Sequence, residues 1–199
     1  MGSVARASHA MTVAEWAALD DDVPGELVDG KLEDEEVTST VHDLVSAWLL
    51  TRLLLWAERR GGHVFGSDHK LALTPRRGRK PDLTVYDADA ELEARARASH
   101  ATPLCVVEVV SPNPRDTRRD RVEKRREYAK AKIRFYWLVD PTMRTVEVFE
   151  LSRDGRYTTA AAAASGKLRV RGLAGLVIDL DALFDAVDRL EHPKRRKRP

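Results

Sequence analysis

An acidic residue stands in the middle of an apolar, β-branched run near the centre of the chain. From Leu104 to Val110 the sequence reads LCVVEVV, and Glu108 is the only polar residue in it. Continuous apolar runs of this length are typical of strands that are buried on both faces of a sheet. A carboxylate in such a strand costs several kcal/mol unless a cation, a metal ion or hydrogen-bond donors compensate it. The sequence therefore predicts a partner for Glu108.

The residues after this run predict a strand, helix, strand crossover. Residues 111–114, Ser-Pro-Asn-Pro, end the strand because proline has a fixed φ and no amide hydrogen for the ladder. A strongly basic helix is expected over 115–132, and a second apolar strand over 135–139 leads to Asp140 and Pro141. Such units build α/β folds, so we expect the acid to lie in the central sheet of an α/β protein.

Turn residues and hydrophobic periodicity divide the rest of the chain into short elements. Upstream, these are a short helix that Thr12 caps, a hairpin over 26–32, a packing helix over 39–59, a two-stranded meander over 63–66 and 69–73, a basic loop over 75–80 and a strand over 81–86. Downstream, they are a hairpin over 145–151 and 157–164, a short strand over 176–180 and a closing helix over 181–190, with Leu190 among its inward-facing residues.

Length and composition suit one globular domain of 199 residues, 43% of them hydrophobic. We expect a disordered N-terminus over 1–11, a domain over 12–190 and a flexible basic tail over 191–199. The single cysteine, Cys105, excludes a disulfide within the chain and favours a reducing, cytoplasmic setting. The chain has neither an apolar run of about 18 residues nor the apolar core of a signal peptide, so no membrane association is expected.

Charge is distributed unevenly along the chain, although the formal net charge is only +2. Residues 12–37 contain ten acids and one base, whereas residues 115–134 contain ten bases and four acids. A basic face beside an acidic site is a plausible footprint for a polyanion. The basic segment is equally compatible with an ordinary solvated helix face.

Two acids lie on neighbouring predicted strands, Asp82 at the head of one and Glu108 in the middle of the other. If both side chains project to the same side of the sheet, the two carboxylates repel, and Mg²⁺ or Mn²⁺ is the natural remedy because both ions prefer oxygen ligands. Such an ion can bind a phosphate, lower the pKa of a water molecule and stabilise a leaving oxygen. These are the requirements of phosphodiester hydrolysis.

A cation is expected beside such a site. Asp120, Lys124 and Tyr128 follow one another at intervals of four residues and therefore share one face of the predicted helix. Lys124 can then point its ammonium over the strand ends towards a phosphate or a water molecule. The alternative is that Asp120 and Lys124 form an ordinary ion pair on a solvated surface.

The chain thus carries a series of spaced motifs: ELVDGKL at 26–32, a helix with His42, HVFG at 63–66, Pro81-Asp82, VVEVVSP at 106–112, the trio Asp120, Lys124 and Tyr128, and YWLVDP at 136–141. This series resembles the Uma-two family of putative restriction endonucleases, which belongs to the PD-(D/E)XK nuclease superfamily. The resemblance spans roughly residues 12 to 185. It implies a restriction-endonuclease-like core, in which helices flank a mixed central sheet, with an added antiparallel β meander and a divalent metal at the acidic strand edge.

The resemblance also implies roles for individual residues. Asp82 and Glu108 match the metal-binding acids of the superfamily, and the backbone carbonyl of Val109 is a further expected ligand. The superfamily's lysine stands two residues after the glutamate, but that position is Val110 here, so Lys124 becomes the candidate.

Four further residues are accessory candidates: Glu26, His42, Asp120 and Tyr128. Glu26 matches an early acid of the family, where an additional metal contact is possible, and as a hairpin residue it is otherwise expected at the surface. His42 occupies the family's usual histidine position.

The leading hypothesis is a metal-dependent DNA endonuclease that acts as a homodimer, with Asp82 and Glu108 holding Mg²⁺ or Mn²⁺ and Lys124 positioning water or charge. The residues expected to bind the phosphate backbone are Arg76, Arg77, Arg79, Lys80, Arg115, Arg118 and Arg119. Two other classes stay open. One is a non-catalytic nucleic-acid-binding or regulatory module, which the valine at position 110 favours, and the other is a structural protein whose acids are paired with the basic helix.

Overall fold

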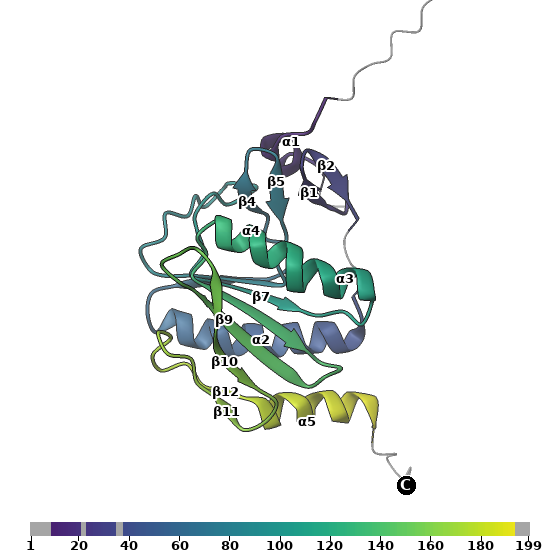
Figure 1. Cartoon of the computed structure of the whole chain (residues 1–199), viewed down its shortest axis with the longest axis vertical. Helices are drawn as coiled ribbons and strands as arrows, with labels where there is room; N and C mark the ends of the chain where they lie inside the picture. Colours follow the sequence, from purple (N-terminus) through teal and green to yellow (C-terminus); the bar gives the residue numbers. More distant parts are fainter. Residues whose placement is uncertain (1–8, 21–22, 35–37, 194–199) are drawn as a thin grey trace, which may run out of the picture.

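A mixed six-stranded sheet forms the centre of the protein (Figure 1). The structure is a computed structural model, and it describes residues 9–20, 23–34 and 38–193. The strands follow the order β10-β9-β8-β7-β6-β3, and only β7 and β8 are parallel. Their bounds are β3 His63–Phe65, β6 Leu83–Tyr86, β7 Cys105–Val109, β8 Phe135–Asp140, β9 Thr145–Leu151 and β10 Tyr157–Ala163. The expected mixed central sheet of an α/β fold is confirmed.

Alternation along β7 separates two apolar clusters on the two faces of this sheet. Cys105, Val107 and Val109 pack in one cluster with residues of α2 (Thr40–Glu58) and α5 (Leu180–Glu191). Val106 and Val110 pack in the other cluster, which includes Tyr128 and Ala129 of α4. The predicted burial of this strand on both faces is therefore confirmed.

The crossover between β7 and β8 consists of three consecutive helical segments rather than one helix. These are α3 (Pro114–Arg118), the π-helical segment η1 (Arg119–Lys124) and α4 (Arg125–Lys130). Asn113 caps α3 by accepting a hydrogen bond from the Arg115 amide. The predicted end at 132 is two residues too late, because Lys132 has a φ of +63° in the left-handed region.

A second, four-stranded sheet with the order β2-β1-β5-β4 lies at the end of the molecule opposite α5 (Figure 1). It contains the predicted hairpin, β1 (Glu26–Val28) and β2 (Lys31–Glu33), and the hairpin of β4 (Leu71–Thr74) with β5 (Arg77–Arg79). The short helix α1 (Val13–Ala17) begins at the predicted cap Thr12, which forms a capping box with Glu15.

Two predictions for this region are wrong. The segments 63–66 and 69–73 do not pair with each other, because β3 pairs with β6 and β4 pairs with β5. The basic loop over 75–80 instead contains the strand β5. Gly78 makes this strand possible, because a β-carbon there would lie 2.2 Å from the Trp16 ring.

The C-terminal region completes the apolar cluster that contains Cys105, Val107 and Val109. The predicted hairpin of β9 with β10 is confirmed, whereas the last strand is shorter than expected and is limited to β12 (Ile178–Asp179), which pairs with β11 (Lys167–Leu168). Leu190 is not inward-facing as predicted but 40% exposed, because it lies in the last turn of α5.

The predicted terminal regions are described only in part, since residues 1–8 and 194–199 lie outside the described residues. Met11 donates a backbone hydrogen bond to the Gly30 carbonyl, and Glu191 is the last residue of α5. Among the described helices, none combines the length and the apolar character that a membrane span requires.

Candidate active site

Strands β6 and β7 bring Asp82 and Glu108 together on one face of the central sheet, where β6 begins and β7 ends. These strands are antiparallel with Leu83 opposite Val107, so that Asp82, one residue further, comes opposite Glu108. Residues directly opposite each other in an antiparallel pair share a face of the sheet. The Val109 amide donates a hydrogen bond of 2.7 Å to Asp82 Oδ2, and this contact fixes the Asp82 carboxylate against β7.

The partner that the sequence predicts for Glu108 comes from the crossover helix. Lys124 Nζ donates to Glu108 Oε2 at 2.9 Å, and the Tyr128 hydroxyl donates to Glu108 Oε1 at 2.6 Å. All three side chains are buried; Glu108 is 3% exposed and Lys124 4%. Each carboxylate oxygen thus has a donor inside the protein, as a buried charge requires.

Asp120 belongs to the same buried group. Its Oδ1 lies 3.4 Å from Lys124 Nζ, and its side chain is as deeply buried as that of Lys124. The alternative of a solvated surface pair is therefore wrong. The spacing of four residues did indicate the shared orientation of Asp120, Lys124 and Tyr128, although the first two lie in the π-helical segment.

Glu26 is not at the surface, contrary to the expectation for a hairpin residue, but 3% exposed. Strand β1 lies between β2 and β5, and this central position brings Glu26 against Arg79. Arg79 Nη1 and the Lys80 amide donate to the Glu26 carboxylate at 2.7 and 2.8 Å, and Lys124 Nζ lies 3.9 Å from it. Burial alone would raise the pKa of Glu26, but Lys124 and Arg79 hold it below its ordinary value.

Three buried carboxylates therefore lie within 4 Å of one ammonium group. Burial alone would lower the pKa of Lys124, but Glu108, Glu26, Asp120 and Asp82 raise it well above its ordinary value, so Lys124 is charged. Burial raises the pKa of Glu108 well above its ordinary value; Lys124 opposes this shift, and the neighbouring acids reinforce it. The site concentrates negative charge around a single lysine.

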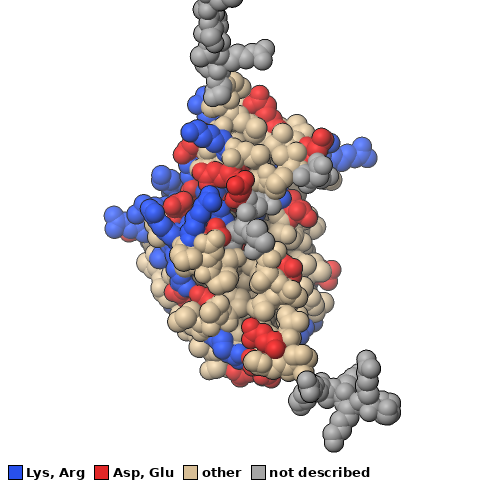
Figure 2. Space-filling view, turned by 90° about the vertical axis from the view of Figure 1, so that its right-hand side faces the viewer, with Lys and Arg blue, Asp and Glu red and all other residues tan. Residues whose placement is uncertain are grey.

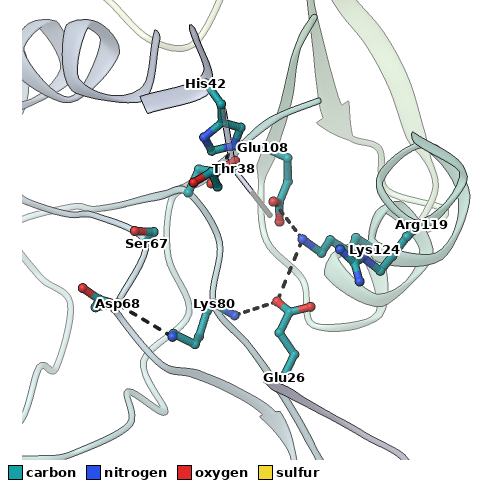
Figure 3. Close-up of a pocket in the computed structure, with 10 residues that line it drawn as sticks. Glu26, Thr38, His42, Ser67, Asp68, Lys80, Glu108, Arg119 and Lys124 are labelled. Atoms are coloured by element: carbon teal, nitrogen blue, oxygen red, sulfur yellow. Dashed lines mark hydrogen bonds and ion pairs between the residues drawn. The ribbon is translucent and has the colours of Figure 1, made fainter. Parts of the chain in front are cut away.

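An open cavity of about 210 Å³ gives access to these groups. Figure 3 shows Lys124 between Glu108 and Glu26 on one wall, with Lys80 and Asp68 across the opening. The lining residues are Glu26, Thr38, His42, Ser67, Asp68, Lys80, Asp82, Glu108, Arg119 and Lys124. The cavity is large enough for a phosphate group and water molecules.

His42 reaches the cavity from the first turn of α2. The Ser39 side chain caps this helix by accepting a hydrogen bond from the His42 amide. His42 Nε2 lies 3.2 Å from Asp82 Oδ1. Asp82 is thus held by the Val109 amide on one oxygen and approached by an imidazole on the other.

Comparison with known proteins agrees with this arrangement. A family model described as a putative restriction endonuclease, Uma2, matches residues 12–181. The chain belongs to the Uma2 family. A crystal structure described as a putative nuclease of the DUF820 group, from Anabaena variabilis, is similar to it with a TM-score of 0.70 at 17% identity; the match covers 89% of this chain and 99% of that one. No curated protein matches. The resemblance found in the motifs and the expected fold class are confirmed.

In this Uma2 protein, Val110 occupies the position where the superfamily's lysine is expected. It lies on the same face of the sheet as Glu108, is buried and packs in the cluster that contains Tyr128. The ammonium that accompanies Glu108 comes instead from Lys124, on the opposing helical segment.

Several cations predicted to bind a phosphate backbone are already paired. Arg79 is 1% exposed and donates to both Glu26 and Glu127, so its assignment to nucleic-acid binding is wrong. Arg77 pairs with Asp29 and Glu127. Arg119 is buried, and its Nη2 lies 3.2 Å from Asp116 Oδ1. Of the remaining four, Arg76, Arg115 and Arg118 are exposed, and Lys80 lines the cavity.

Sequence reasoning missed the contribution of Thr38, Ser67 and Asp68 to the cavity wall. These residues lie in the segments before α2 and after β3, where no periodicity marks a side chain as inward or outward.

The residues present fit a divalent cation by their chemistry. Asp82 and Glu108 offer hard carboxylate oxygens to one cavity. Burial raises the pKa of Glu108, and repulsion from the neighbouring acids, Asp82 among them, adds to the shift; a divalent cation relieves repulsion of this kind. Within the described ranges, no group of three or more histidine, cysteine, aspartate or glutamate side chains is arranged to hold a metal ion. A metal here would depend on the two carboxylates, backbone oxygen and water.

Proposed function

We propose that this Uma2 protein is a metal-dependent endonuclease that hydrolyses phosphodiester bonds in DNA. The observation that carries the proposal is the 2.9 Å contact between Lys124 and Glu108 in a cavity that Asp82 also lines. Two carboxylates and an ammonium in one open cavity combine the charges that a phosphate and its attacking water require.

Each residue of the site has a separate part in this proposal. Asp82 and Glu108 would hold Mg²⁺ or Mn²⁺, together with the backbone carbonyl of Val109. When bound, the ion would activate water and stabilise the leaving oxygen. Lys124 would place its positive charge beside the phosphate or the attacking water, while His42 and Tyr128 orient the Asp82 and Glu108 carboxylates.

The proposal extends to the setting in which the enzyme acts. A homodimer would present one site to each strand of a duplex. A reducing, cytoplasmic location suits the buried free thiol of Cys105.

The test is cleavage of supercoiled plasmid with Mg²⁺ or Mn²⁺, with and without EDTA, for the wild type and Glu108→Ala. Glu123→Ala is the matched control, because Glu123 is an exposed glutamate in η1, the segment that carries Lys124. We expect cleavage by the wild type and the control, and loss of cleavage with EDTA or with Glu108→Ala. Equal inactivity of all three proteins towards plasmid, with DNA binding retained, would instead favour the non-catalytic binding module.

A further inference from the structure

A basic groove lies on the outer side of the crossover helix, away from the cavity. It has a volume of about 470 Å³ and runs between the η1–α4 segment and the turn that precedes β10. Its charged lining residues are all cations, namely Arg121, Arg125, Arg126, Lys130 and Arg156; the other lining residues are Val122, Ala129, Gly155 and Tyr157. The groove therefore presents positive charge without an acid in its wall.

Three of the five cations are available to a ligand. Arg126, Lys130 and Arg156 are exposed, and in the described part of the chain no carboxylate forms an ion pair with any of them. Arg121, by contrast, is engaged by Glu147 and Asp140 at 2.5 and 3.3 Å. The positive charge of the groove is thus only partly neutralised from within the protein.

Arg125 is held in place at the groove by contacts that do not neutralise its charge. Its guanidinium lies 4.0 Å from the centroid of the Phe149 ring, and its Nη2 donates to the Tyr157 carbonyl at 3.2 Å. A stacked and hydrogen-bonded guanidinium loses little further side-chain entropy when it binds a phosphate. The groove therefore has a pre-positioned cation in addition to the exposed side chains of Arg126 and Lys130.

The spacing of these cations suits a chain of phosphates better than a single anion. Arg126 and Lys130 are four residues apart along α4, which corresponds to about 6 Å of helix length. Phosphates on one strand of a duplex advance by about 3.4 Å each along its axis and are further apart in space because the strand winds around it, so cations about 6 Å apart can contact successive phosphates. Arg156 adds a cation from the opposite side of the groove.

We propose that this groove binds the phosphodiester backbone of duplex DNA, an inference that rests on the proposed function for its choice of nucleic acid. Lys124 and all the groove cations except Arg156 belong to the same helical stretch; Lys124 contacts Glu108, whereas these other cations line the groove. In Figure 2, Lys and Arg side chains gather on the left of the face, at the height of α3 and α4 in Figure 1. DNA bound there would lie along the outside of the helix that carries the lysine of the site.

The test measures binding without cleavage, by fluorescence anisotropy of a labelled 30-base-pair duplex in EDTA at several salt concentrations. The groove variant combines Arg126→Gln, Lys130→Gln and Arg156→Gln. The matched control combines Lys167→Gln, Arg169→Gln and Arg171→Gln, which removes the same charge from exposed residues around β11. Circular dichroism melting curves establish that both variants are folded.

We expect the groove variant to bind at least tenfold more weakly than the wild type at 0.1 M salt. Its plot of log K against log salt concentration should be shallower by about 2 to 3, because each lost phosphate contact removes about 0.9 from the slope. The control should keep the wild-type slope. A single bound anion, rather than a backbone, would change the slope by no more than about 1.

Equal binding by the groove variant and the control, or no binding by the wild type, overturns the proposal that the groove binds DNA. The plasmid assay distinguishes this failure from failure of the proposed function. If the groove variant alone loses binding and the wild type does not cleave, the groove binds DNA but the protein is not a nuclease. If cleavage depends on Glu108 but the groove variant and the control bind equally well, the protein is a nuclease and the groove does not bind DNA.

Discussion

Replacing Lys124 with methionine should destabilise the protein strongly, because the ammonium is shared by several buried acids. Its Nζ lies 2.9 Å from Glu108, 3.4 Å from Asp120 and 3.9 Å from Glu26. Methionine has a similar length and no charge, so Lys124→Met removes the charge with little change in packing volume. The acids are then left to face one another in a buried site.

The expected loss in the free energy of unfolding is about 3–5 kcal/mol at pH 8, the usual cost of removing one partner of a buried ion pair. With a urea m-value of about 2–3 kcal/mol/M, this loss moves the unfolding midpoint by about 1–2 M. Lys130→Met is the control, because Lys130 is exposed on α4 and should change stability by less than about 0.5 kcal/mol.

The loss should shrink as the pH falls. In the variant the ammonium no longer opposes the burial that raises the pKa of Glu108. A carboxyl whose folded pKa lies above its unfolded value binds more protons in the folded state, so its contribution to stability grows as the pH falls from the raised folded pKa towards about 4.5. Urea unfolding of Lys124→Met followed by tryptophan fluorescence between pH 8 and pH 5 measures this trend.

A double-mutant cycle separates the ion pair from general damage. Glu108→Gln removes the opposing charge, so the loss in Lys124→Met/Glu108→Gln should be smaller than the sum of the two single losses by about 0.5–3 kcal/mol. Strict additivity at pH 8, or a Lys124→Met loss no larger than that of Lys130→Met, would refute the claim that Lys124 compensates buried charge.

Three further predictions concern the packing and titration of other groups. Gly78→Ala should cost about 1–3 kcal/mol in urea unfolding because its methyl group meets the Trp16 ring, whereas Gly66→Ala, with no atom within 4 Å, should not carry this cost. Cys105 should react with Ellman's reagent far more slowly in the native state than in denaturant, because it is buried and burial raises the pKa of its thiol. Glu26 has a lowered folded pKa, so the wild type should lose stability as the pH falls below about 4.5 and Glu26→Gln should lack this component; equal acid sensitivity in both would contradict the assignment.

Local sequence patterns revealed the acid site because a carboxylate in a buried strand is energetically unfavourable without a partner. A glutamate in the apolar run of β7 required a partner wherever the rest of the chain lay, and the four-residue spacing of Asp120, Lys124 and Tyr128 indicated which face of the helix supplied it. The π-helical form of residues 119–124 could not be read in the same way, because the side chains keep a common orientation over so short a stretch.

The cations of the 76–80 segment show where local patterns fail. An Arg-Arg-Gly-Arg-Lys run has the composition of a solvated loop, and nothing within it distinguishes Arg79 from Arg76. Arg79 is buried because β5 pairs with β1, which brings Glu26 to it from 53 residues away, and because α4 brings Glu127 from 48 residues away. Only the tertiary fold contains that information. Sequence patterns therefore placed the buried Arg79 among the expected phosphate-binding residues and did not identify the groove around Arg126.

The valine at position 110 changes how the lysine of the site is positioned. A lysine two residues after Glu108 would be fixed on the same face of β7 by the backbone of the sheet. Lys124 reaches Glu108 from a separate helical segment, so its position depends on the groups that hold that segment and its side chain. Asp120, Glu26 and Glu108 surround its ammonium, and the Tyr136 hydroxyl donates to the Asp120 carbonyl at 3.0 Å, which ties η1 to β8. In this chain, buried ion pairs and one tyrosine hydrogen bond therefore hold the lysine, whereas the strand backbone would hold a lysine at position 110.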